Sequence, residues 1–153
     1  MEDSYRIHET MAPGEKVVEM RRGANWFYYV AILAALNAIV MMFTGMFGFA
    51  LGFGVSYYVD GRMLTEIGQG SPESVRWAGV GINILIAAVF AVFGYFARKG
   101  SDIAFIVGMF LYVADAMLIL MYRDSIGFAF HLLALFFMFK GLLGSRKRYD
   151  PSV

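Results

Sequence analysis

Two ionisable residues lie well inside long apolar stretches of this chain and are the strongest candidates for chemistry. Asp115 lies within residues 103–122, and His131 lies within residues 126–143. An ionisable side chain at membrane depth costs about 2.5–3.5 kcal/mol on insertion scales, so it usually has a partner or a function. Because imidazole titrates near neutral pH, a carboxylate and an imidazole in contact can share a proton there. The pair predicts a proton relay, or a polar binding pocket that opens to the outer face.

The spacing of these residues from the turn between them predicts that they meet. Asp115 lies seven residues before Tyr122, which is about 10 Å at helical rise. His131 lies six residues after Ser125, which is about 9 Å on the same scale. The short turn at 123–125 makes the two helices antiparallel neighbours. The two side chains should therefore lie level and form a hydrogen bond.

Three further polar residues belong to the predicted centre. Asn83 should lie at a similar depth, and Asn37 lies nearer the midplane of its span. Tyr112 precedes Asp115 by about one helical turn, so it could join either arrangement. Each span then contributes one polar group to a single centre. The structural alternative is that these groups only hold helices together, since interhelical hydrogen bonds in membranes average about 0.6 kcal/mol each.

Ser56 is a remote candidate for a nucleophile. It follows Gly54 in a Gly-x-Ser pattern near the outer face, and a serine–histidine dyad with His131 would be the minimal site of an intramembrane serine hydrolase. The sequence lacks the second glycine of the rhomboid-type Gly-x-Ser-x-Gly setting, and its spans are fewer than that fold's six. Ser56 is more simply explained as a loop residue.

No metal or cofactor site is predicted, and no catalytic residue is assigned. Cysteine is absent, and the second histidine, His8, lies in the tail on the opposite side from His131. No spacing corresponds to a zinc, di-iron or bis-histidine haem site. We therefore expect a protein without a cofactor and without enzymatic activity.

The composition indicates a membrane protein. The chain has 153 residues, of which 59% are hydrophobic and 16% are charged. Its mean hydropathy is +0.62, and the charges avoid the apolar stretches almost entirely, which is typical of bilayer proteins. The net charge of +1 provides no basic field that would attract nucleic acid. The expected partners are the lipid bilayer and either another membrane protein or a second copy of this chain.

The apolar stretches predict an all-α membrane four-helix bundle with spans at about 26–43, 75–97, 103–122 and 126–143. Together they form a transmembrane domain over 24–144, between a tail at 1–23 and a basic tail at 145–153. Residues 15–22 have two alternatives: a short helix on the membrane surface, or a tail that orders only near the bilayer.

The segment 44–70 between the first two spans is rich in glycine and is predicted to be interfacial or re-entrant on the outer side. Within it, Met63 and Ile67 continue an apolar row at four-residue spacing that suits an interfacial helix. Asp60, Arg62 and Glu66 would then face water.

Lysine and arginine placement predicts the orientation of the bundle. Only Arg62, Arg76 and Arg123 fall on one side of the membrane. The other side carries Lys16, Arg21, Arg22, Arg98, Lys99, Lys140, Arg146, Lys147 and Arg148. Both termini are therefore expected in the cytoplasm. Arg146, Lys147 and Arg148 could contact anionic lipid headgroups, or act only as a positive-inside signal.

Three stretches resemble a group of small, uncharacterised bacterial four-span proteins over most of residues 22–143. They are Gly23-Ala24-Asn25-Trp26-Phe27-Tyr28, Tyr112-Val113-Ala114-Asp115-Ala116 and the segment from Asp124 to His131. The resemblance implies a bacterial inner-membrane location and brings no assigned activity. The leading functional hypothesis is a structural or accessory subunit of a membrane complex. The alternative is a small transporter or proton-coupled carrier that uses the Asp115–His131 pair.

Overall fold

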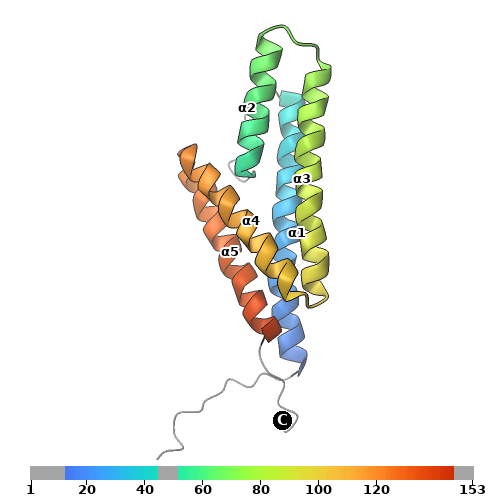
Figure 1. Ribbon diagram of the computed structural model, residues 1–153, viewed down its shortest axis with the longest axis vertical. Coiled ribbons are helices and arrows are strands. Elements are labelled where there is room, and N and C mark those ends of the chain that lie inside the picture. Colours follow the sequence, from blue (N-terminus) through green and yellow to red (C-terminus); the bar gives the residue numbers. More distant parts are fainter. Residues whose placement is uncertain (1–12, 45–51, 147–153) are drawn as a thin grey trace, which may run out of the picture.

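Five helices make up the computed structural model in Figure 1, which describes residues 13–44 and 52–146. In chain order they are α1 (Pro13–Thr44), α2 (Gly54–Gly68), α3 (Ser74–Arg98), α4 (Asp102–Met121) and α5 (Ser125–Arg146). Four of them, α1, α3, α4 and α5, are long and apolar enough to cross a membrane. The protein is therefore a multi-pass membrane protein, and the predicted all-α bundle is confirmed.

The first span differs from its prediction because α1 begins at Pro13, well before residue 26. The helix is continuous from Pro13 to Thr44, so residues 15–22 form neither a separate surface helix nor an irregular tail. The helix continues through Gly23 and Ala24 because both lie against α5 or the apolar core, where tertiary packing outweighs the weak helix propensity of glycine.

α2 is the helix that does not span the membrane, since its 15 residues are too few to cross it. It packs against α3 and α4. Its buried face carries Ser56, Asp60 and Met63. The prediction that Asp60 faces water is wrong, because Gly79 of α3 leaves room for Met63 and thereby brings this face of α2 against α3. Arg62 is exposed, as predicted.

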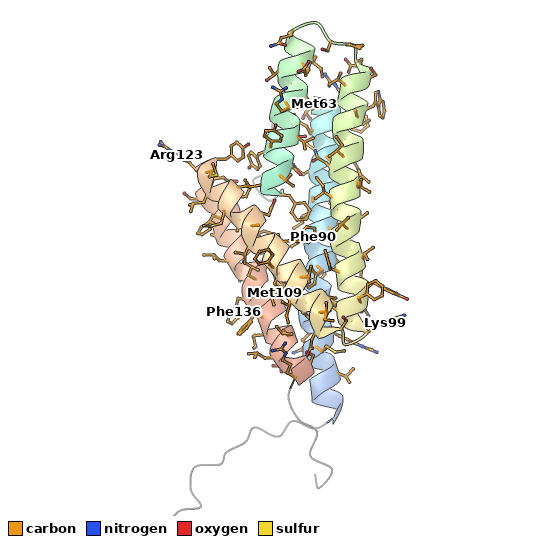
Figure 2. All side chains as sticks on the ribbon, in the orientation of Figure 1. Met63, Phe90, Lys99, Met109, Arg123 and Phe136 are labelled. Atoms are coloured by element: carbon orange, nitrogen blue, oxygen red, sulfur yellow. The ribbon has the colours of Figure 1, made fainter. Side chains whose placement is uncertain are left out.

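The two halves of the bundle diverge on one side (Figure 1). α4 and α5 lie close to α1 and α3 at the end where the described chain begins and ends, and they lean away toward their turn at 123–124. α2 and the adjoining ends of α1 and α3 extend past that turn. Figure 2 shows the side chains on these helices, with Phe90 of α3 and Met109 of α4 labelled near the middle of the bundle.

The helix ends partly differ from the sequence predictions. Ser101, rather than Asp102, caps α4, because its hydroxyl accepts a hydrogen bond from the Ala104 N–H at 3.2 Å. Asp102 instead accepts hydrogen bonds from Ser145 and Arg146 of α5. These contacts join the start of α4 to the end of α5.

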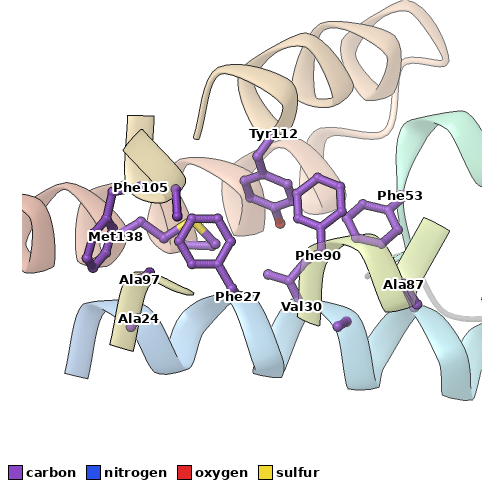
Figure 3. Packing of buried hydrophobic residues seen from close by; sticks show 14 of the residues in the cluster. Ala24, Phe27, Val30, Phe53, Ala87, Phe90, Ala97, Phe105, Tyr112 and Met138 are labelled. Carbon is purple, nitrogen blue, oxygen red and sulfur yellow. The ribbon is translucent and has the colours of Figure 1, made fainter. Parts of the chain in front are cut away.

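The apolar core is built from aromatic rings packed against small residues, as Figure 3 shows. Phe27 of α1 lies next to Phe105 of α4, with 5.9 Å between ring centroids. At the other end of the same cluster Phe53, Phe90 and Tyr112 pack together. The core therefore connects α1, α3, α4 and α5, because Met138 of α5 also belongs to it, and Val55 of α2 packs against it.

Helices α1 and α5 approach closely at Gly23 and Gly141. A Cβ atom at position 23 would lie only 2.4 Å from the Gly141 Cα atom, which is backbone and cannot rotate away. Small residues at such crossings let membrane helices pack closely. This crossing fixes α5 against the end of α1 that carries Arg21 and Arg22.

We expect Gly23→Ala to destabilise the protein by about 1–3 kcal/mol, because the added methyl group forces two backbones apart. The matched control is Gly81→Ala in α3, where a Cβ atom would meet nothing within 4 Å. The measurement is the fraction of detergent-solubilised protein that remains monodisperse after heating. Equal thermal stability of the two variants would contradict the close α1–α5 crossing.

Candidate functional site

Asp115 and His131 are in direct contact inside the bundle. Asp115 Oδ2 lies 2.9 Å from His131 Nε2. The two residues are only 6% and 1% exposed. The carboxylate–imidazole hydrogen bond predicted from the helical rise on either side of the turn is therefore present.

The second ring nitrogen of His131 determines where the protons lie. Nδ1 is 2.8 Å from the backbone oxygen of Gly127. Because a carbonyl oxygen only accepts, Nδ1 must carry a hydrogen. A single proton then lies between Nε2 and Asp115 Oδ2, on the imidazole of an ion pair or on the acid of a neutral pair. The pair has zero net charge in both cases, which suits a site deep in an apolar bundle.

Asp115 also caps α2 from a different helix. Its Oδ2 accepts a hydrogen bond from the Gly54 N–H at 2.8 Å, and its Oδ1 accepts one from the Val55 N–H at 2.9 Å. The first N–H groups of a helix have no partner within the helix and favour negative charge. The residue that precedes α2, Phe53, makes no side-chain cap. The carboxylate from α4 therefore supplies the missing cap.

Gly54 makes this cap sterically possible. A Cβ atom at position 54 would lie 2.5 Å from the backbone oxygen of Asp115 and 2.7 Å from Leu118 Cβ. Any side chain larger than hydrogen would push α2 away from α4. Glycine is required at position 54 because α2 and α4 approach closely there, and not because of its backbone conformation.

Tyr112 joins the centre through its ring. It stacks on His131 with ring centroids 4.3 Å apart and an angle of 14° between the planes. The other side of the ring faces the aromatic cluster, where Tyr112 lies beside Phe90 and Phe53 (Figure 3). Tyr112 therefore shields the imidazole from the apolar core and fixes its orientation.

Asn83 belongs to a second polar pair and not to the predicted single centre. Its Nδ2 donates to Asp60 Oδ1 at 2.7 Å, and both side chains are buried, with 1% and 3% of their surface exposed. Burial raises the pKa of the Asp60 carboxyl, while the Asn83 hydrogen bond opposes that effect. Asn37 lies against the backbone of Gly52, where its Nδ2 would be 2.9 Å from an added Cβ atom. The polar residues are thus distributed around α2.

A third acidic residue connects α2 to the α4–α5 turn. Tyr57 donates its phenolic hydrogen to Asp124 Oδ2 at 2.8 Å and stacks on Tyr122 with 5.4 Å between centroids. Burial and the adjacent Asp124 raise the pKa of Tyr57 to about 12. The other oxygen of Asp124 accepts from the Gly127 N–H at 2.9 Å and so caps α5. These roles of Asp124 and Tyr57 were not predicted from the sequence, where Asp124 belongs only to a tight turn.

The serine hydrolase alternative gains no support from this geometry. Both nitrogens of His131 are engaged, by Asp115 and by Gly127. Ser56 Oγ is buried on the face of α2 that contacts α3, and it has no hydrogen-bond partner among the described residues. Neither nitrogen of His131 is left to accept a proton from that hydroxyl.

A cavity of about 340 Å³ reaches Asp115. Apart from Asp115, its walls are apolar and come from α2, α3 and α4. They are formed by Val55, Phe90, Leu111, Ala114 and Leu118. Among the residues that the structure describes, no three His, Cys, Asp or Glu side chains gather as a metal site would require.

The predicted headgroup contacts lie at the opposite end of the bundle from the α4–α5 turn. Arg146 is exposed there and pairs with Asp102, with Nε 3.2 Å from Oδ2. Lys147 and Arg148 lie outside the described residues. The Asp102 contact leaves part of the Arg146 guanidinium available to a lipid phosphate.

No protein-family model, curated protein or solved structure matches this chain. The resemblance to small bacterial four-span proteins therefore stays a prediction.

We expect Asp115→Ala to destabilise the fold by about 3–5 kcal/mol, because it removes one partner of a buried pair and both acceptors of the α2 cap. Asp115→Asn should cost less, since an amide keeps one acceptor and can donate to Nε2. The measurement is thermal unfolding in detergent, with Asp102→Ala at the exposed α4–α5 contact as the control. If Asp115→Ala lowered the thermal stability no more than Asp102→Ala does, the capping role of Asp115 would be contradicted.

Proposed function

We propose that this protein is a non-enzymatic accessory subunit that packs against a larger membrane protein. The observation that carries the proposal is the internal use of its strongest polar groups. Both oxygens of Asp115 and both nitrogens of His131 bind atoms of the same chain. Groups engaged in this way hold the helices in place and leave little for a substrate.

The outward faces of three helices support a role in packing. Large apolar side chains are exposed there, among them Leu85 of α3, Phe110 of α4 and Phe136 of α5. Lipid tails or the helices of a partner would cover them in a membrane. Because helix association in lipid depends on shape and not on a hydrophobic driving force, rigid aromatic ridges suit a partner surface.

We further propose a bacterial inner-membrane location with both termini in the cytoplasm. The start of α1 and the end of α5 lie at the same end of the bundle (Figure 1). Among the described side chains, Arg21, Arg22, Arg98, Lys99 and Arg146 gather toward that end of their helices. This asymmetry supports the orientation under the positive-inside rule.

Purification from the native membrane in a mild detergent tests the subunit role. We expect the chain to elute with a larger membrane protein at a fixed ratio, measured by the mass and composition of the peak. An unrelated multi-pass protein purified in the same way is the control for adventitious association. A peak that contains only copies of this chain would contradict the proposal.

A second candidate, a proton-coupled carrier, is favoured by one specific observation. The Asp115–His131 hydrogen bond lies beside the cavity of about 340 Å³ that reaches Asp115. A buried acid and imidazole that share one proton are suited to accept and pass on another.

If the carrier role holds, vesicles that contain the protein should dissipate an imposed pH gradient faster than empty vesicles, as measured with an entrapped pH-sensitive dye. Asp115→Asn should reduce this rate to that of empty vesicles, because the amide cannot take up the proton. Glu66→Gln, on the exposed Arg62–Glu66 pair, is the matched control and should keep the wild-type rate. A wild-type rate equal to that of empty vesicles would exclude proton flux without a co-substrate.

A further inference from the structure

A carboxylate from α4 holds the first turn of α2, while the Asp60–Asn83 and Tyr57–Asp124 contacts hold the turns that follow. We propose that Asp115 and His131 form a proton-controlled latch, which holds the first turn of α2 against α4 and releases it when the pair takes up a second proton. The latch is a conformational function of the chain itself. It requires neither the accessory partner nor net proton flux.

α2 is the helix whose position can change without removing a span from the membrane. Its 15 residues do not cross the bilayer, and helices of this length are marginal without tertiary contacts. Its first N–H groups lie inside the bundle, where an unsatisfied backbone group is costly. The Asp115 carboxylate satisfies two of them directly.

The proton count gives the direction of the switch. With one shared proton, Asp115 accepts from α2 and remains in contact with His131. A second proton would leave a neutral Asp115 acid beside an imidazolium, and the protonated oxygen of Asp115 could no longer accept from its present partner. Protonation of Oδ2 would remove the bond to Nε2, and protonation of Oδ1 would remove the bond to the Val55 N–H. A neutral acid is also a weaker acceptor at a helix N-terminus than a carboxylate. Acid therefore weakens the attachment of the first turn of α2.

Removing the shared proton has a different result. The carboxylate would then face the lone pair of Nε2, and the Asp115–His131 contact would weaken. The negative charge at the N-terminus of α2 would remain, together with its two N–H donors. Alkaline conditions should therefore leave α2 docked, and release is confined to the acid side.

Few other charges in the described chain face this pair. Tyr112 stacks on His131 from α4, and α2 presents its backbone N–H groups. The α1 and α3 members of the adjoining apolar cluster, such as Ala34 and Phe90, carry no titratable group. Asp60 and Tyr57 are titratable groups on α2, but they pair with Asn83 and Asp124. Among these groups, proton uptake by the Asp115–His131 pair is therefore the event that changes the charge at the N-terminus of α2.

Ser56 is a suitable reporter of release because it lies on the buried face of α2, with 3% of its surface exposed. The chain contains no cysteine, so Ser56→Cys creates a single thiol of nearly the same size. The probe is a membrane-permeant maleimide, applied to the full-length protein in vesicles between about pH 8 and pH 5. Labelling of an exposed Tyr58→Cys variant corrects for the intrinsic pH dependence of the thiol reaction.

We expect the corrected labelling rate of Ser56→Cys to rise about tenfold toward acid, as local opening of α2 becomes populated. In the Asp115→Asn background the rate should be independent of pH. Ala97→Cys, buried in α3 away from α2, controls for unfolding and should stay protected throughout.

A flat corrected rate in the otherwise wild-type protein would overturn the latch, and this outcome does not require Asp115→Asn to fold. An acid-induced rise that persists in Asp115→Asn would also overturn it, as would a parallel rise for Ala97→Cys. His131→Gln provides a second variant that keeps the carboxylate. It should shift the midpoint of the pH response, and an unchanged midpoint would contradict the sharing of the proton.

Discussion

The first turn of α2 imposes the constraint on which the rest of the structure depends. Its backbone N–H groups lie inside an apolar bundle, and no side chain at the start of the helix accepts from them. A carboxylate from α4 resolves this, because Asp115 binds the N–H groups of Gly54 and Val55 at once. That bond requires the helices to approach closely, and so it requires glycine at position 54.

The same carboxylate must also be compatible with its apolar surroundings. His131 provides this by sharing a proton with it, and Gly127 fixes the orientation of the imidazole by accepting from Nδ1. One residue therefore completes a helix cap and a proton-sharing pair. A structural role and a proton-dependent role are both consistent with this geometry, since any change in the protonation of Asp115 alters the cap.

α2 gives the bundle its asymmetry. Two more carboxyl groups hold it, through the Asp60–Asn83 bond to α3 and the Tyr57–Asp124 bond to the α4–α5 turn. These contacts lie on successive turns of one short helix, so they resist its displacement together. The polar residues of the chain are thus concentrated around the one helix that does not span, while the four spans pack mainly through glycine, alanine and aromatic side chains.

The sequence by itself determined the four spans, because long apolar stretches must form hydrogen-bonded helices in a bilayer. It also determined the Asp115–His131 contact, since helical rise and a short turn place both residues at one level. Only the tertiary structure decided the role of α2, the pairing of Asn83 with Asp60, and the continuation of α1 back to Pro13. Hydropathy records which residues avoid water, but it does not record which neighbouring helix a buried polar group faces. In this protein that choice depends on close approaches at Gly54, Gly79 and Gly23, whose effect exists only once the helices have packed.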